Sequence, residues 1–394
     1  MWDDLTGQDE AIAVVRSAAV SAASSGSAAE AARGMTHSWL ITGPPGSGRS
    51  NLAFAFATAL LSPGTSEGDL AAQRQVEART HPDLAVLSTE RVIISIDEVR
   101  SLVASSQFAP SVGRFRVMVI EDADRMTERT SNVLLKALEE PPERTVWILC
   151  APSEADLLPT IRSRVRTVRL KVPGVADVAA LIQRRDGVDA QTAERAARHA
   201  QSHIGMAHRL ATNAEARQRR ERTLELALGI RSVSDAVLAA AELLEVAGAD
   251  AKAITEERDA EEREHALRSL GIEPGGTIPP ALRGQIRQLE EDQKRRATRS
   301  LRDGIDRILT DFLSLYRDVM MLQLGGGSEL VNTELRERLA ALSAHTTPAA
   351  TLAAMDAVAT TRLRIDGNVA PALALEAMLT TIFRGAAARK GTDQ

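Results

Sequence analysis

The feature that most constrains this chain is a glycine-rich loop, Gly43 to Ser50, between a short apolar run and an apolar helix pattern. The run Ser38–Thr42 predicts a buried strand, and the segment from Ser50 to about Leu61 is apolar all along its length, as in a buried helix. A strand, a glycine loop and a helix in this order direct backbone N–H groups and a helix N-terminus at a phosphate. We therefore expect an α/β domain built around a phosphate-binding loop.

Strand-like and helix-like segments alternate along the rest of the first half. Further strands are expected at Leu84–Leu87, Val92–Ile96, Arg116–Ile120, Thr145–Cys150 and Val168–Val172. Helices are expected at Asp9–Ala23, Asp97–Ser106 and Thr130–Glu140, whereas Ser62–Thr80 is polar without strong periodicity. This alternation predicts a parallel sheet with helices on both faces.

After Pro173-Gly174 nothing resembles a strand. Two or three short alanine-rich helices are expected between Val175 and Thr212, and a helical region from Asn213 onward with a break at Gly271–Pro280. A stripe of apolar residues with spacings of four and three predicts one long buried helix, ended by glycines 325–327: Leu301, Ile305, Ile308, Phe312, Leu315, Val319 and Leu322. The predicted domains are an α/β module (residues 1–172), a small helical lid (173–212) and an all-α domain (213–394).

Composition narrows the class of protein. A length of 394 residues suggests two or three domains, and a net charge of −5 argues against a wholly basic, nucleic-acid-binding surface, so any DNA contact is local or shared. The single cysteine, Cys150, excludes an internal disulfide and a cysteine-based zinc site, and His81 and His203 are expected in packing or surface roles. The acidic N-terminus and the lack of a long apolar run predict a cytoplasmic chain without membrane contact.

The glycine loop departs from a working nucleotide site. Gly43, Gly46 and Gly48 fit the P-loop spacing and Ser50 supplies its hydroxyl, but Arg49 stands where a lysine bridges the terminal phosphates. Glu121-Asp122, after the strand 116–120, resembles a magnesium-binding Walker B pair in reversed order. Two interpretations remain. Either lysine was replaced by Arg49 with the function intact, in a chain in which only five of 48 basic residues are lysine, or the site binds nucleotide weakly or not at all and does not hydrolyse it.

Two motifs then identify a family. The segment Asn132–Pro142 reads N-x-L-L-K-x-L-E-E-P-P, and Leu158–Arg164 reads L-P-T-I-x-S-R. Together with Asp4–Gln8, which looks like a G-Q box beside an adenine site, they resemble the bacterial clamp-loader branch of the AAA+ ATPases over roughly residues 1–212. This is the family of the gamma/tau and delta-prime subunits of DNA polymerase III. The helical remainder resembles the collar through which that family pentamerises.

The resemblance also implies which kind of subunit this is. The catalytic gamma/tau kind has a P-loop lysine, Asp-Glu in Walker B, a polar pair after the next strand and a lid arginine. Here these positions hold Arg49, Glu121-Asp122, Ala151-Pro152 and Gly205. The four departures favour the delta-prime kind, with a degenerate site that holds ATP or ADP with magnesium weakly or not at all. The family's four-cysteine zinc module is excluded because Ser62–Thr80 has no cysteine. The alternatives are an active gamma-type ATPase and an AAA+ assembly factor outside replication.

A last motif, Ser163-Arg164, implies a role in a complex. By resemblance, Arg164 is an arginine finger offered in trans to ATP on a neighbouring gamma/tau subunit, held by the Ser163 turn. The alternative is a structural salt bridge at the end of a loop. The expected partners are the gamma/tau and delta subunits, the ring-shaped sliding clamp and, through the complex, primer-template DNA. With 3% aromatic residues, stacking on single-stranded bases is not the expected DNA contact.

Overall fold

The structure of the protein, a computed structural model, describes residues 2, 5–24, 36–64, 66–89, 93–269, 283–326 and 329–387. The chain divides into two compact units, Met1–Thr212 and Asn213–Gln394. The expected break at Gly271–Pro280 lies outside the described residues.

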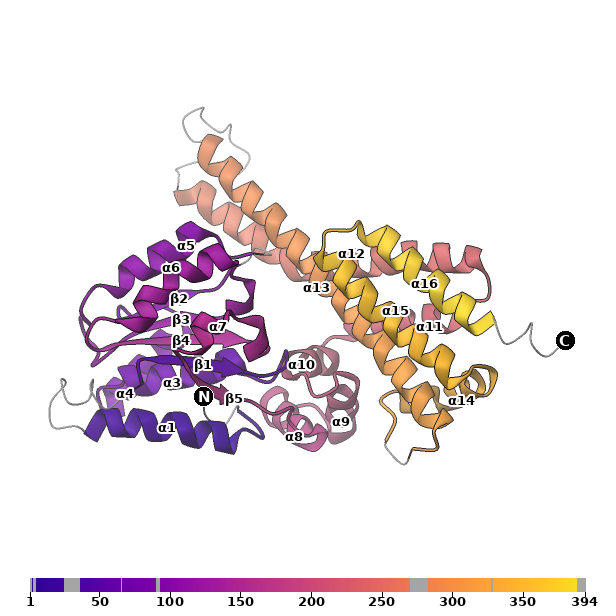
Figure 1. Ribbon diagram of the computed structural model, residues 1–394, viewed down its shortest axis with the longest axis horizontal. Coiled ribbons are helices and arrows are strands. Elements are labelled where there is room, and N and C mark those ends of the chain that lie inside the picture. The colour runs from indigo at the N-terminus through magenta and orange to yellow at the C-terminus, as the bar shows by residue number, and fades with distance from the viewer. Residues whose placement is uncertain are drawn as a thin grey trace. The chain divides into compact units, whose positions relative to one another are not determined.

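Unit 1 is built on a parallel sheet whose described strands follow the order β2-β3-β4-β1-β5 (Figure 1). The strands are β1 (Ser38–Thr42), β2 (Leu84–Leu87), β3 (Arg116–Ile120), β4 (Thr145–Ala151) and β5 (Arg166–Arg169). The first three coincide with the predicted strands, β4 is one residue longer, and β5 begins two residues earlier than expected. The predicted parallel sheet is thus confirmed.

The strand predicted at Val92–Ile96 is wrong over the part that is described. Ile94 forms an isolated bridge with Met126, and helix α5 already begins at Ile96. Ser95 caps this helix because its side chain accepts from the Glu98 N–H while the Glu98 side chain accepts from the Ser95 N–H. The capping box therefore starts a helix where the β-branched residues had predicted a strand. Val92, at the start of the predicted strand, lies outside the described residues.

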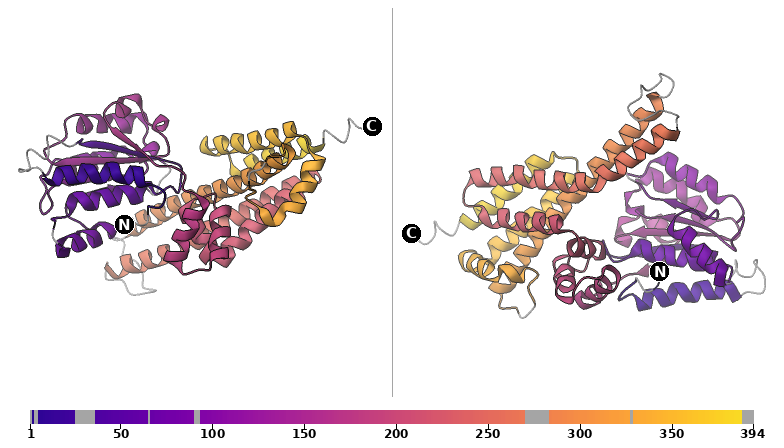
Figure 2. Two further views of the ribbon diagram at one scale, coloured as in Figure 1. Left: turned by 90° about the horizontal axis from the view of Figure 1, so that it is seen from below. Right: turned by 180° about the vertical axis from the view of Figure 1, so that it is seen from behind.

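Helices cover both faces of the sheet, as Figures 1 and 2 show. One face packs against α1 (Asp9–Ser24), α3 (Arg49–Leu61) and α4 (Ser66–Glu77), and the other against α5 (Ile96–Ser106), α6 (Glu128–Glu139) and α7 (Pro159–Arg162). Along β1, Trp39 and Ile41 enter the first core and Leu40 the second, as the two-residue strand period requires. Helix α4 lies in the polar stretch Ser62–Thr80, where no helix was predicted.

A buried carboxylate orders the loop between α5 and β3. Asp83 is fully buried and accepts the backbone N–H groups of Ser111, Val112 and Gly113 at 2.6, 2.7 and 2.6 Å. The guanidinium of Arg116 lies 3.6 Å away from the same carboxylate. Three successive N–H groups on one anion form a rigid nest.

Three short helices complete unit 1: α8 (Val175–Asp186), α9 (Ala190–His199) and α10 (Ile204–Thr212). They pack through small buried side chains, including Ala193, Ala196, Ala197 and Ala207. Gly187 ends α8 in the left-handed conformation (φ 68°), and Asp189 caps α9 by accepting the Thr192 N–H. That these residues act as a lid on nucleotide remains a prediction.

The described part of unit 2 is built from helices. Its α-helices are α11 (Ala214–Gly229), α12 (Val233–Ser269), α13 (Arg283–Gln323), α14 (Arg336–His345), α15 (Pro348–Asp366) and α16 (Pro371–Ala387). The predicted stripe lies on α13, where Ile305, Phe312, Leu315 and Val319 are fully buried in the centre of the unit. Helices α12 and α13 run side by side well past the other helices of the unit (Figures 1 and 2). The expected fold class is confirmed. No described helix is both long and apolar enough to cross a membrane.

Adjacent arginines fasten α11 to its neighbours in unit 2. Arg219 and Arg307 both contact Asp250 of α12, at 3.0 and 2.5 Å. Arg220 is 7% exposed and donates to Asp311 of α13 at 3.0 Å and to the side-chain oxygen of Asn332. A planar guanidinium can hold two acceptors at fixed angles, which an ammonium group does less well.

Candidate functional site

The P-loop lies between β1 and α3, and its three glycines have separate reasons to be glycine. Gly46 and Gly48 have φ angles of 78° and 93°, which side-chain-bearing residues rarely adopt. A Cβ on Gly43 would lie 2.8 Å from Leu170 Cβ and 2.7 Å from the Ser47 hydroxyl. Ser50 follows on the first turn of α3. The backbone frame of a phosphate-binding loop is therefore present.

The side chain of Arg49 folds back onto this frame. Its Nη1 donates to the carbonyl oxygen of Gly43 at 2.8 Å, within the same loop. Burial raises the pKa of the neighbouring Asp124 carboxyl, Asp122 adds to that effect, and the Arg49 charge opposes it. Arg49 thus lies among the carboxylates after β3 but directs one of its donors at its own loop rather than outward.

The reversed acidic pair after β3 is also engaged by arginines. The side chain of Glu121 is 14% exposed and forms an ion pair with Arg79 at 2.7 Å. The carboxylate of Asp122 lies 3.7 Å from the guanidinium of Arg125. Arg79 stands over the ring of Phe54 at 5.2 Å and has a left-handed backbone (φ 56°). A carboxylate that is paired with a guanidinium is a poor magnesium ligand, so this pair fits magnesium poorly. Arg79 lies in a polar stretch, and nothing in the sequence pointed to it.

The turn between α9 and α10 packs directly on the P-loop. The Ile204 N–H donates to the Gly46 carbonyl at 3.3 Å, and His203 Nδ1 accepts the Met206 N–H at 3.2 Å. A Cβ on Gly46 would lie 2.2 Å from Cγ of the His203 ring. His203 therefore packs on the loop, and Gly205, at the position of the lid arginine, adjoins its ring.

This contact gives a first prediction. Gly46→Ala should destabilise unit 1 by about 1–3 kcal/mol, because the methyl group meets the His203 ring and the positive φ disfavours alanine. Thermal unfolding measures the loss. In a His203→Ala background the same substitution should cost clearly less, since only the backbone strain remains. An equal cost in both backgrounds would mean that the ring and the loop are not in contact.

The G-Q box ties the N-terminus to the end of the sheet. Gln8 is 2% exposed, its amide donates to the Lys171 carbonyl at 2.8 Å, and its oxygen accepts the Lys171 N–H at 3.0 Å. The side chain thereby pairs with the backbone directly after β5 in the manner of a short β-bridge. Leu5 lies against Gly48 of the P-loop, and Asp4 is outside the described residues.

The second predicted site, Ser163-Arg164, lies at the turn between α7 and β5. Arg164 Nε donates to Glu139 at 2.6 Å, and its Nη1 donates to the Thr160 carbonyl at 2.7 Å and to the Ser163 hydroxyl at 3.1 Å. The side chain remains 32% exposed. Glu139 belongs to the L-E-E-P-P motif, so the two motifs of the resemblance meet in this ion pair.

No group of three or more His, Cys, Asp or Glu side chains in the described ranges is arranged to hold a metal ion. Cys150 is fully buried on β4, and burial raises the pKa of its thiol. His81 is buried, and its Nδ1 accepts the Asp83 N–H at 3.1 Å.

The order of the strands, with a P-loop directly after β1, which lies between β4 and β5, and an acidic pair after β3, defines unit 1 as an AAA+-type P-loop module. Residues 26–173 match the protein family described as "DNA polymerase III, delta subunit". That part of the chain, which is less than half of its length, is similar to this family.

Individual relatives agree with the family match. The chain is 36% identical to the DNA polymerase III subunit delta′ of Pseudomonas aeruginosa over 146 residues, which are 36% of this chain and 44% of that protein. It is 33% identical over 143 residues to subunit delta′ of Escherichia coli (35% and 43%), and 30% identical over 139 residues to subunit tau/gamma of Haemophilus influenzae (34% and 20%). The chain thus spans less than half the length of these relatives.

Among solved structures, a gamma-subunit-related protein of DNA polymerase III from Thermotoga maritima aligns with 89% of this chain and 94% of its own, at 17% identity and a TM-score of 0.40. The fold assignment rests on the sheet order and the P-loop, and the similarity to the family on residues 26–173.

Proposed function

We propose that this chain is a clamp-loader subunit of the delta-prime kind, which keeps a degenerate nucleotide site and offers Arg164 to ATP on a neighbouring gamma/tau subunit. The observation that carries the proposal is the engagement of both halves of its own site by arginines. Arg49 bonds to the loop that it would serve, and Arg79 pairs with Glu121. The delta′ names of the relatives from Pseudomonas aeruginosa and Escherichia coli support the same interpretation.

Hydrolysis at the chain's own site would need several changes at once. Arg49 would have to leave the Gly43 carbonyl and reach a terminal phosphate, and Glu121 would have to exchange Arg79 for magnesium. The first exchange would break a charge-assisted hydrogen bond and the second an ion pair. No chemical step is therefore assigned to this site, and any nucleotide held there would act as a structural ligand.

A turnover assay tests this part of the proposal. The isolated protein should show no steady ATP hydrolysis, and Arg49→Lys should not restore it, because Glu121-Asp122 remains reversed and paired. The measurement is phosphate release with magnesium, beside binding of a fluorescent ATP analogue. Steady hydrolysis together with micromolar binding by the wild-type protein would instead favour the gamma-type ATPase.

The Arg164 guanidinium suits a role on another subunit. It is partly exposed, and its intramolecular partners include one carboxylate, Glu139, whose side chain is 43% exposed. Exposed ion pairs contribute about 0–1 kcal/mol, so a phosphate on a neighbouring subunit can displace Glu139 at little cost. Ser163 and Thr160 remain to orient the fork.

The proposed partners are the gamma/tau and delta subunits, the sliding clamp and, through the complex, primer-template DNA. Capture of purified gamma/tau and delta subunits by the tagged chain tests this assembly. Failure to retain either subunit would leave an AAA+ assembly factor outside replication as the better interpretation.

A further inference from the structure

The edge of the sheet at β5 carries an uncompensated positive charge. Arginines with exposed or, for Arg164, partly exposed side chains follow one another along the turn and strand at positions 162, 164, 166 and 169. Two of them pair with carboxylates: Arg164 with Glu139 and Arg169 with Glu154. For Arg162 and Arg166 no carboxylate in the described ranges forms an ion pair. The N-terminal half of this edge therefore attracts acidic groups.

The backbone of β5 is open on the same side. Within the described sheet β5 pairs with β1 alone. The Leu170 N–H bonds to the Thr42 carbonyl at 2.7 Å, and alternate residues of a strand point the same way, so Thr167 and Arg169 direct their N–H and C=O groups to the open edge. An open edge of this kind is a template for one more strand.

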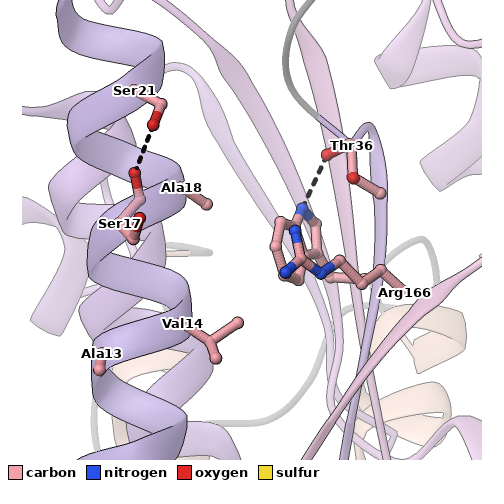
Figure 3. A pocket seen from close by; sticks show the side chains of 8 residues that line it. Ala13, Val14, Ser17, Ala18, Ser21, Thr36 and Arg166 are labelled. Carbon is pink, nitrogen blue, oxygen red and sulfur yellow. Dashed lines mark hydrogen bonds between the residues drawn. The ribbon is translucent and has the colours of Figure 1, made fainter.

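A pocket of about 400 Å³ lies beside this edge, between α1 and the start of β5 (Figure 3). Figure 3 shows Val14, Ser17 and Ala18 of α1 on one side and Thr36 and Arg166 on the other. The Arg166 guanidinium stacks on the indole ring of the fully buried Trp39 at 5.0 Å, which fixes its place in the pocket wall. The other lining residues besides Trp39 have small apolar or hydroxyl-bearing side chains, so the pocket has room for a side chain that enters from the edge of the sheet.

From these three features we infer that the β5 edge binds an extended acidic peptide segment of another protein. The segment adds as a strand along Thr167 and Arg169, and one of its carboxylates enters the pocket and pairs with Arg166. The open backbone groups favour a peptide over a nucleic acid, because a nucleic-acid backbone cannot continue the strand ladder. The two-residue period of a strand predicts acidic residues at alternate positions of the segment.

Fluorescence polarisation with the full chain tests this inference. The probe is a labelled peptide of alternating Glu and Thr; the comparison probes are its Lys-Thr counterpart and an oligothymidylate. The Glu-Thr peptide should bind and the Lys-Thr peptide should not. Arg166→Ala should weaken binding by about tenfold, the effect of one charge-assisted pair.

A second substitution separates strand addition from simple charge attraction. Thr167→Pro removes an N–H that points to the open edge, a position where sheets tolerate proline, so the pairing of β5 with β1 is retained. It should abolish peptide binding, while Thr167→Val, the matched control, should leave it unchanged. Circular dichroism verifies that both variants fold. Equal binding to Thr167→Pro and wild type, absence of peptide binding, or tighter binding of the oligothymidylate would each overturn the inference.

Discussion

Replacing Arg164 with alanine is expected to lower the DNA-stimulated ATPase rate of a reconstituted clamp loader by about tenfold or more, since an arginine finger contributes a large factor to phosphoryl transfer. Assembly should be retained, because the side chain is partly exposed and its loss leaves the α7–β5 turn intact. Turnover is measured by phosphate release with saturating clamp and primed DNA, and assembly by gel filtration. Arg164→Lys should recover little, because an ammonium group lacks the planar fork.

Two matched variants separate the finger from a salt bridge. Glu139→Gln removes the intramolecular carboxylate and leaves Arg164 in place, so the ATPase rate should stay within about twofold of wild type. If Arg164 acts only as the partner of Glu139, both substitutions should lower the rate alike. Arg162→Ala, an exposed neighbour, controls for a loss of positive charge at the same surface. Unchanged turnover in Arg164→Ala would contradict the proposed role.

The largest stability effect is expected from Asp83. Asp83→Ala leaves the N–H groups of Ser111, Val112 and Gly113 without their acceptor and Arg116 without its counter-ion. Losses of this kind cost about 3–5 kcal/mol, equivalent to roughly 6–20 °C of unfolding temperature in a unit of this size. Differential scanning calorimetry of the full chain measures the shift. Asp97→Ala, an exposed carboxylate paired with Arg100, should change stability by less than about 0.5 kcal/mol.

The pH dependence gives an independent check on Asp83. Burial raises the pKa of its carboxyl, but hydrogen bonds from Gly113, Ser111 and Val112 outweigh burial, so the pKa lies below its ordinary value. Its contribution is therefore complete above the unfolded-state pKa of about 3.9 and disappears as the pH falls through the lowered folded-state pKa. Wild type and Asp83→Ala should converge in stability below that range. A difference that persists there would show that the carboxylate charge is not what orders the loop.

The sequence predicted those parts of unit 1 in which local pattern and burial agree. Strands β1, β2 and β3 are short, largely apolar runs, with β1 and β3 in the interior of the sheet and β2 at its end, and they lie where they were expected. Helix α4 was missed because its residues are polar and its contacts with α3 are made by few side chains, such as Val76. The strand predicted at Val92–Ile96 failed because the capping of α5 by Ser95 is a property of side-chain hydrogen bonds, which apolar periodicity does not register.

The candidate site was predictable only in its motifs. The glycines, Arg49 and Glu121-Asp122 follow from spacing, but their partners come from elsewhere in the chain: Arg79 after α4 and His203 before α10. Likewise Glu139 and Arg164 are separated by 25 positions in the sequence, and only folding brings them together. Sequence spacing identifies the groups that could act, and the tertiary structure decides which of them are already engaged.

The two long helices α12 and α13 are expected to unfold locally more easily at their outer end than in the centre of unit 2. Near α11 the pair is held by Arg307 of α13, which contacts Asp250 of α12 at 2.5 Å with side chains 27% and 12% exposed, and by the buried residues around Phe312. Farther out, Arg263 and Glu290 join the helices at 2.9 Å with both side chains 45% exposed. Exposed contacts of this kind stabilise the helices less, so the protection of backbone amides from hydrogen exchange should fall along α12 and α13 from the centre of the unit outward. Salt screens exposed ion pairs far more than buried ones, so added salt should steepen this gradient.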